Sequence, residues 1–510
     1  MDLFNGYKIG YLFAFVPDSN LASLVEQALN FYTQFPVISE AIESDLDAYG
    51  LAKKAIRNEA KRYESREIPS LPDFAPSLAP VMLSPRILGV GRPRMNPVLV
   101  FLFLVLRGYF GSTSNRATYD LFQESITLHV LLDQRGISLP KRQTLVDNLN
   151  AVSNATRELI LDCQIQCVYE NGLDDFQEIT FDSTPVSGYS QFPNDAISMR
   201  NCLLRSYSIL EILTKEKLIE FHSSSWLQSW RSEIGKLTSS INMVSGKKSS
   251  GKRKKMYRRL IHIVEKTVGR LTSHYEEAQA LCAEGKFPVS AWVSVLAIRK
   301  KVEELGKLLQ NAKAAADQAK KRILEKEKVP MNEKFLGLGD PDASLIVKGG
   351  RETKFGYRPN LARSRNGFIV EMHVEKGNTS DSKILPKILT NTMDRTGITP
   401  ECVTVDDGYA SEQNRADVLK CGVRLFTVSG AKGKKITPET EWESPEMKHE
   451  CKQRSAVESL ISTLKGTFHF GKNSRTHLDA VKAEMLEKVL AYNFERITLI
   501  CSRLSEEKAA

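Results

Sequence analysis

Two stretches of the sequence end in the same way, Glu178-Ile179-Thr180-Phe181-Asp182 and Val403-Thr404-Val405-Asp406. Each alternates apolar and polar side chains, as a β-strand does when its successive side chains point to opposite faces of a sheet. The alternation places each aspartate on the face opposite the apolar residue before it, near a strand end where a loop opens to solvent. Neighbouring strands would bring the two carboxylates close together.

Two adjacent carboxylates repel each other and raise each other's proton affinity unless a cation lies between them. The pattern therefore suggests a divalent metal site, because carboxylate oxygens are ordinary ligands of such ions. A pair of exposed acids at two strand ends explains the same residues without any metal. Asp407 competes with Asp406 for this role, but its parity puts it on the face of Val403 and Val405.

The segments around these strands predict an α/β domain with a mixed sheet flanked by helices, interrupted by a large helical insertion. Residues 195–335 are mostly helical in composition. After them, two runs of strand character joined by a polar loop predict a hairpin over 354–359 and 367–374. Further elements follow in the order helix 384–393, strand 403–406, helix 412–420 and strand 423–428.

The N-terminal part predicts an all-α region. Residues 1–67 have helical composition, and a proline-rich run then reads as a linker. Asn96 and Pro97 are a typical N-cap and first-turn pair before an apolar run, and two more short helices are expected after Ser114 and near Thr144. Short helices with basic residues, among them Lys141 and Arg142, are typical of a helix-turn-helix DNA-binding unit, although plain helix packing gives the same pattern.

Positive charge is concentrated in one segment of the chain. The 510 residues carry 71 Lys and Arg against 61 Asp and Glu, a net +10. Residues 247–328 hold 21 Lys and Arg against 9 Asp and Glu, a net +12 that leaves −2 for the rest. The densest cluster contains Lys252, Arg253, Lys254, Lys255, Arg258 and Arg259. We expect it to contact phosphates of nucleic acid, and a solvated loop is the alternative.

Other features point to the cell interior. The longest apolar run, 98–106, is shorter than the roughly 20 residues that span a bilayer. The N-terminus lacks the pattern of a secretory signal, and the eight cysteines are scattered without metal-site spacing. We therefore expect a cytoplasmic protein with reduced cysteines and no membrane partner.

A late helix presents three charged residues on one stripe. At about 100° per residue, Arg454, Glu458 and Lys465 project within roughly 40° of one another. Apolar residues fill the adjacent arc, namely Val457, Leu460, Ile461, Leu464 and Phe468. An ordinary Arg–Glu pair one turn apart explains part of this pattern.

Together these residues resemble the DDE transposases of bacterial insertion sequences. The resemblance rests on Asp182-Ser183-Thr184, on Asp406-Asp407-Gly408-Tyr409, and on Arg454-x3-Glu458-x6-Lys465, with Cys451 where the family signature places Tyr. Gly377-Asn378-Thr379-Ser380-Asp381-Ser382 and Gly91-Arg92-Pro93 are also similar to family segments. The likeness covers about 86–500, and the basic insertion looks closest to the ISNCY-type group.

The resemblance implies an RNase H-like catalytic domain in which Asp182, Asp406 and Glu458 hold two Mg²⁺ or Mn²⁺ ions. Two metals can stabilise both the attacking and the leaving oxygen at a phosphodiester. It further implies cleavage at transposon ends, transfer of the 3′-OH into target DNA, phosphate contacts by Arg454 and Lys465, and a dimer or larger assembly near the nucleoid. An endonuclease that does not join strands, or a transposase-derived DNA-binding protein, are the alternatives.

The expected domains are an N-terminal helical region (1–85), a helical DNA-binding domain (86–175), the catalytic domain (176–194 with 336–470), the basic insertion (195–335) and a C-terminal helical segment (471–510).

Overall fold

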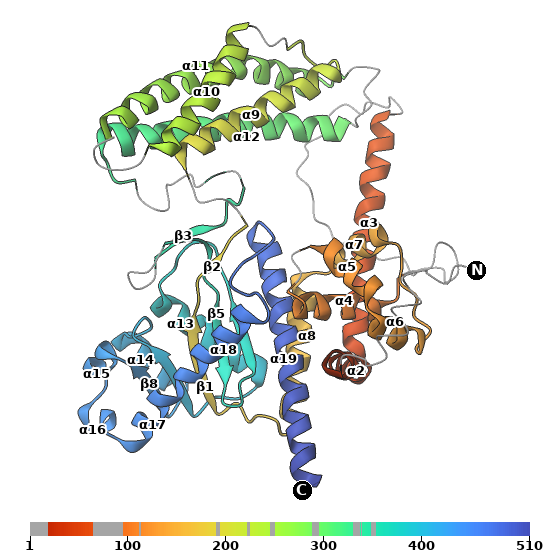
Figure 1. Cartoon of the computed structure of the whole chain (residues 1–510), viewed down its shortest axis with the longest axis vertical. Coiled ribbons are helices and arrows are strands. Elements are labelled where there is room, and N and C mark those ends of the chain that lie inside the picture. Colours follow the sequence, from red (N-terminus) through yellow and green to blue (C-terminus); the bar gives the residue numbers. More distant parts are fainter. Residues whose placement is uncertain are drawn as a thin grey trace. The chain divides into compact units, whose positions relative to one another are not determined.

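The computed structural model describes residues 19–64, 95–111, 114–189, 194–221, 225–244, 250–287, 295–329, 337, 339–347 and 353–509. The described residues fall into two compact units (Figure 1). The first unit draws on residues 1–50, 92–190 and 342–510, and the second on 51–91 and 191–341. The predicted proline-rich linker and Gly91-Arg92-Pro93 lie outside the described residues.

The first unit contains a five-stranded mixed sheet with the strand order β6-β5-β1-β7-β8. Its strands are β1 (Glu178–Ser183), β5 (Asn360–Ser364), β6 (Ile369–His373), β7 (Cys402–Asp406) and β8 (Leu425–Ser429). β1 runs antiparallel to β5 and parallel to β7, and β7 runs parallel to β8. The predicted mixed sheet with flanking helices is therefore confirmed, and the two aspartate-bearing strands are neighbours.

The predicted hairpin is wrong in its first strand. Lys354–Tyr357 forms β4 of a separate three-stranded sheet, with β2 (Val186–Ser187) and β3 (Ser344–Ile346). The hairpin instead pairs β6 with β5, the segment expected to be a polar loop. β5 tolerates its polar residues in a buried strand because they have partners: the Asn360 amide oxygen accepts from Tyr409, and the Ser364 hydroxyl accepts from the Phe368 backbone.

Helices surround this sheet (Figure 1). They are α13 (Asp381–Thr396), α14 (Glu412–Lys420), α15 (Ala431–Ile436), α16 (Glu439–Trp442), α17 (Pro445–Gln453) and α18 (Ser455–Gly466). α13 packs against β5 and β6, α17 against β8, and α18 against β1. The predicted apolar side of the late helix is confirmed, because Val457, Leu460, Ile461, Leu464 and Phe468 are all buried.

The rest of the first unit is helical. Its helices are α2 (Ser19–Gln34), α3 (Pro36–Glu64, which continues past residue 50), α4 (Pro97–Tyr109), α5 (Asn115–Glu124), α6 (Ile126–Asp133), α7 (Arg142–Ala151), α8 (Asn154–Glu170) and α19 (Leu478–Ala509). Asn96 caps α4 as predicted, and its side chain accepts from Val98 N at 3.1 Å. α6 was not foreseen, so four short helices stand where three were expected.

α4 lies in the core of this helical part. Every residue from Leu99 to Gly108 is buried. α4 packs against α19 so closely that a Cβ on Gly108 would lie 2.0 Å from the backbone oxygen of Glu487. α4 is therefore a core helix, and its buried residues cannot contact the grooves of DNA.

A buried ion cluster joins these helices to α19. The Glu487 carboxylate accepts from Arg107 Nε at 2.8 Å, Arg157 Nε at 2.9 Å and Arg475 Nη2 at 3.0 Å. Burial lowers the pKa of Arg107 to about 10, against the attraction of Glu487. Burial alone would raise the pKa of Glu487, but the three guanidinium groups hold that pKa far below its usual value. Ion pairs in this cluster thus connect α4 and α8 to α19.

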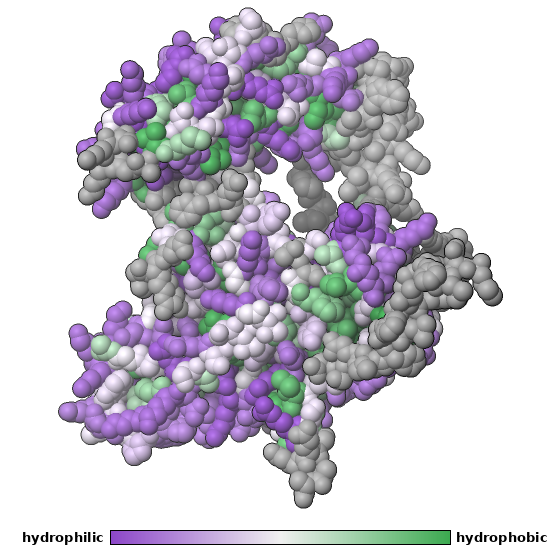
Figure 2. All heavy atoms as spheres, in the orientation of Figure 1, coloured by the Kyte–Doolittle hydropathy of each residue, from purple (hydrophilic) through white to green (hydrophobic). Residues whose placement is uncertain are grey.

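The second unit is a set of long helices around its own apolar core. They are α9 (Asp195–Lys215), α10 (Ser225–Met243), α11 (Ser250–Ala283) and α12 (Val295–Ala319), followed by the π-helical turn η2 (Lys320–Glu325). Leucine, isoleucine and alanine side chains from all four helices form the core. Figure 2 shows a largely hydrophilic outer face on these helices, with scattered hydrophobic patches. No helix in the described parts of the chain is long and apolar enough to cross a membrane.

Candidate active site at the ends of β1 and β7

Asp182 and Asp406 end two adjacent parallel strands. The β1–β7 register pairs Thr180 with Thr404, and each acid lies two residues farther along, on the same face of the sheet. Asp182 is buried, and its Oδ1 accepts from Ser183 N at 2.7 Å. Asp406 Oδ1 accepts from Gly408 N at 2.8 Å. The two carboxylates predicted from the strand pattern therefore occupy one edge of the sheet.

A third aspartate reaches this edge from α13. A Cβ built on Gly408 would lie 2.9 Å from Asp406 Oδ1 and 2.9 Å from Asp381 Oδ2. The missing side chain of Gly408 thus leaves room for two carboxylates to approach its backbone. This close approach gives a physical reason for glycine at the third position of Asp406-Asp407-Gly408-Tyr409.

Asp381 is held in place by two neighbours. Its Oδ1 lies 3.1 Å from Arg358 Nη2, and both side chains are about nine-tenths buried, with exposed fractions of 9% and 11%. Asn414 Nδ2 bridges the backbone oxygens of Ser382 and Tyr409, at 2.8 Å each. The start of α13 and the loop after β7 are therefore fixed to each other, which fixes Asp381 relative to Asp406.

Tyr409 lies beneath the three aspartates and is fully buried. Burial raises the pKa of its hydroxyl well above the usual value, and the charges of Asp381, Asp182 and Asp406 raise it further. The hydroxyl therefore stays protonated and donates to Asn360 Oδ1 at 2.7 Å. This bond ties the loop after β7 to β5.

The remaining predicted residues lie next to β8. The register pairs Asp406 with Ser429, whose hydroxyl accepts from Arg454 Nη1 at 3.1 Å. Arg454 Nη2 in turn donates to Glu458 Oε1 at 2.6 Å, and Glu458 is 59% exposed. The Arg–Glu pair one turn apart is thus present, and a short chain of contacts connects it to the strand beside Asp406. Lys465 is half-buried on the same helix.

Asp407 has a different role from Asp406. Its Oδ1 accepts from Gly433 N at 3.1 Å and from Lys432 N at 3.2 Å, in the first turn of α15. The carboxylate therefore caps the start of a helix, where backbone N–H groups lack partners within the helix. It is directed to α15 and not to the edge that holds Asp182 and Asp406.

The donor set fits a hard divalent cation only in part. Asp182 and Asp406 offer carboxylate oxygens, the ligands that Mg²⁺ prefers. Within the described residues, however, no three His, Cys, Asp or Glu side chains are close enough to hold a metal ion together. Glu458 is paired with Arg454, so a three-acid site requires that its carboxylate leave that guanidinium.

The predicted DNA-binding cations lie on helices. Lys141 and Arg142 are exposed at the start of α7. The cluster from Lys252 to Arg259 begins α11, so the alternative of a solvated loop is wrong for these residues. Arg259 makes two hydrogen bonds to Glu233, at 2.7 and 2.9 Å, while Arg258, Lys252 and Lys255 are exposed.

Part of this edge lies in a segment that is similar to known proteins. Residues 332–494 match the model of the transposase DDE domain family. This part of the chain is therefore similar to a transposase DDE domain. A transposase for the insertion sequence element IS1106, from Neisseria meningitidis serogroup B, is 26% identical over 156 residues. The match covers 30% of this chain and 51% of that relative, so the chain spans about half the length of the curated relative it matches. No solved structure matches.

The DDE domain implies an RNase H-like fold, which agrees with the mixed sheet. The matched residues include Asp406 and Glu458 but not β1, which carries Asp182. Sequence reasoning assigned no role to Asp381, Arg358 or Asn360. The segment 377–382 was a usable signal for Asp381, but Arg358 and Asn360 lie in a region read as a strand end and a loop.

Proposed function

We propose that this protein is a transposase that cuts DNA at the ends of its element and joins the freed 3′-OH to target DNA. The observation that carries this proposal is the pair Asp182 and Asp406 on adjacent parallel strands, with Glu458 paired to Arg454, which contacts Ser429 beside Asp406. Double-stranded DNA is then the substrate, as terminal inverted repeats and as target.

Asp182, Asp406 and Glu458 would hold two Mg²⁺ ions, which Mn²⁺ can replace. Bound there, the ions would stabilise the attacking and leaving oxygens of an in-line displacement. In the first reaction a water oxygen attacks phosphorus and the bond to the 3′ oxygen breaks. In the second, the freed 3′-OH attacks a target phosphorus and forms a bond to it, while the bond to the 3′ oxygen of the target strand breaks and releases a 3′-OH. Backbone N–H groups of Ser183 and Gly408 would help to orient the carboxylates of Asp182 and Asp406.

Arg454 and Lys465 would bind phosphates of the element end. Arg454 already pairs with Glu458 at 2.6 Å, with its partner 59% exposed. A DNA phosphate is a competing bidentate acceptor for the same guanidinium. Arrival of DNA would thereby release Glu458 toward Asp406, so the third acid joins the site only when substrate is bound.

Other basic residues would hold DNA farther from the acids. We assign this role to the exposed cations among Lys252, Arg253, Lys254, Lys255, Arg258 and Arg259, and to Lys141 and Arg142. Four of them occupy the first turns of α11, where positive charge opposes the helix dipole and an anion would be stabilised. We further propose action as a dimer or larger assembly on paired ends, in the cytoplasm and close to the nucleoid.

The decisive experiment is nicking of a duplex that carries the element end, in Mg²⁺. Asp182→Asn, Asp406→Asn and Glu458→Gln should each abolish nicking, while DNA affinity stays near that of the unaltered protein. Calorimetric titration with Mn²⁺ supplies a readout apart from activity, and the Asp182 and Asp406 variants should lose heat of binding. Nicking that survives in one variant removes that residue from the assignment.

Strand joining needs a separate assay. A pre-cleaved end with a free 3′-OH is offered together with target plasmid, and the joined product is measured. Hydrolysis without any joined product would leave a metal-dependent endonuclease, and no divalent-ion binding at all would leave a DNA-binding protein.

A further inference from the structure

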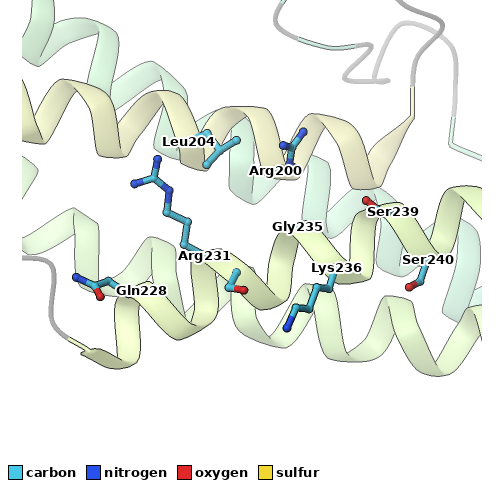
Figure 3. A pocket seen from close by; sticks show the side chains of 9 residues that line it. Arg200, Leu204, Gln228, Arg231, Gly235, Lys236, Ser239 and Ser240 are labelled. Atoms are coloured by element: carbon cyan, nitrogen blue, oxygen red, sulfur yellow. The ribbon is translucent and has the colours of Figure 1, made fainter.

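The second unit has a groove between α9 and α10 (Figure 3). None of the residues expected from the sequence to bind DNA lines this groove. Its volume is about 860 Å³. Arg200 and Leu204 line it from α9, and α10 contributes the remaining side chains, namely Gln228, Arg231, Ser232, Gly235, Lys236, Ser239 and Ser240. The described lining thus contains three cations and several hydroxyl or amide donors, and no carboxylate.

Several cations elsewhere in the second unit have carboxylate partners. Examples are Arg205 with Glu304, Arg259 with Glu233, and Arg322 with Asp195, at 2.7 to 3.0 Å. In the groove, Arg200 and Lys236 form no ion pair with any described carboxylate, and Arg231 lies 3.6 Å from Glu211 in an exposed, loose pair. Arg200 and Lys236, which pair with no described carboxylate, together with the neighbouring neutral donors, are suited to an anionic ligand.

The shape indicates an extended anion rather than a small one. The lining residues of α10 recur about every third or fourth position from Gln228 to Ser240, so they follow one side of the helix. At 1.5 Å per residue this stripe is about 18 Å long. Phosphates of one DNA strand rise by about 3.4 Å each, so the groove matches a stretch of about five nucleotides.

We propose that the α9–α10 groove binds the phosphodiester backbone of duplex DNA, as a contact surface separate from the basic start of α11. The inference rests on the proposed function for the identity of the polyanion. Arg200, Arg231 and Lys236 pair with phosphates, and the serine hydroxyls and Gln228 donate hydrogen bonds to phosphate oxygens. Such contacts position DNA without reading its sequence.

Gly235 makes a sharp test possible because it lies in the groove with open space around it. A Cβ added there meets nothing within 4 Å. Replacing glycine within a helix also favours the helix, so the variants should fold at least as well as the original chain. Gly235→Glu adds an anion to the groove and Gly235→Lys adds a cation. Gly269→Glu is the matched control, since Gly269 is exposed on α11 and also has open space.

The measurement is the affinity of the full chain for a labelled duplex by fluorescence anisotropy, over a series of KCl concentrations. Gly235→Glu should weaken binding by about 3- to 10-fold and reduce the slope of log affinity against log salt by about 1, as for one lost phosphate contact. Gly235→Lys should strengthen binding by a similar factor. Arg200→Gln combined with Lys236→Gln should act like Gly235→Glu.

The proposal is overturned if both Gly235 variants match Gly269→Glu in affinity and salt slope. Nicking at saturating DNA separates this failure from failure of the proposed function. Gly235→Glu should still nick when DNA is saturating, because the acids of the first unit are untouched. Absence of nicking by the unaltered chain would refute the proposed function while leaving the binding comparison valid.

Discussion

Buried ion pairs of the first compact unit and exposed cations of the second use charge in opposite ways. The first unit contains buried pairs, as in the cluster around Glu487 and in the pair Arg358–Asp381. In the second unit many cations are exposed, and in the α9–α10 groove Arg231 has only an exposed pair with Glu211 at 3.6 Å. A buried pair fixes geometry because losing either partner leaves a costly isolated charge. An exposed cation adds little to stability and remains available to a polyanion. The difference therefore separates residues that shape the acid site from residues that would hold DNA.

The largest effect is expected at the buried ion cluster. Glu487→Gln removes the only carboxylate that three guanidinium groups share among the described contacts, and it should lower the free energy of unfolding by about 3–5 kcal/mol. Chemical denaturation measures the change. Glu446→Gln, which breaks the exposed pair with Arg424, is the control and should change stability very little. Equal losses in the two variants would contradict the distinction between buried and exposed ion pairs.

The cluster around Glu487 should also make the stability of the protein depend on pH. Because the pKa of Glu487 is lowered in the folded protein, its stabilising contribution is present above the pKa of the unfolded chain and is lost as the pH falls through the lower, folded value. As the pH falls below about 4.3, where an exposed glutamate protonates, this contribution should therefore decline progressively until the folded value is reached. In Glu487→Gln the corresponding stability is missing at every pH.

The next effect concerns Asp381 as a positioning residue for Asp406. Asp381→Asn keeps the shape of the side chain but removes the charge that pairs with Arg358, and nicking should fall by about 10- to 100-fold, as when an outer partner of a metal ligand is lost. Mn²⁺ affinity by calorimetry should weaken in parallel, and the melting temperature should also fall, because Arg358 is left buried without its carboxylate. Arg358→Gln should act in the same direction, and the double variant should lose less than the sum of the two. Full additivity, or unchanged metal affinity, would assign the pair to stability alone.

A smaller effect is expected at the start of α11. Changing Lys252, Lys254 and Lys255 to Gln should weaken DNA binding at every sequence and flatten its salt dependence by up to about 0.9 per lost phosphate contact. Arg259→Gln serves for comparison, because Arg259 is already engaged by Glu233 and should alter the slope less. An unchanged slope in the triple variant would leave these lysines as a solvated helix face.

The smallest effect is expected at Asp407. Asp407→Ala removes the cap of α15 and should cost about 1 kcal/mol of stability, while Asp407→Asn keeps an acceptor and should cost less. Both variants should retain most nicking activity, measured beside Asp406→Asn. Loss of nicking in Asp407→Asn at an unchanged melting temperature would mean that Asp407, and not Asp406 alone, serves the reaction.

Local pattern was enough to predict the strands that bear Asp182 and Asp406, the helix that bears Glu458, and the cap at Asn96. The strands and the helix are recognised from the spacing of apolar residues over a short stretch. That spacing arises because one face of the strand or helix is buried. The same reasoning failed for β5, because its polar residues are buried only through partners supplied by distant segments, such as Tyr409 for Asn360. It also could not show that α4 is a core helix, since the packing of Gly108 on Glu487 joins residues far apart in the chain.

The sequence by itself determined which side chains can do the chemistry and where the positive charge is concentrated, because residue identity, strand parity and net charge are local properties. Only the tertiary structure decided which of those residues lie close together in space. Strand order brought Asp182 beside Asp406, the start of α13 added Asp381 through the space left by Gly408, and the packing of α9 on α10 gathered three cations into one groove. This proximity depends on packing between segments that are far apart in the chain. The free energy of that packing is shared among many weak contacts, so no short stretch of sequence predicts it.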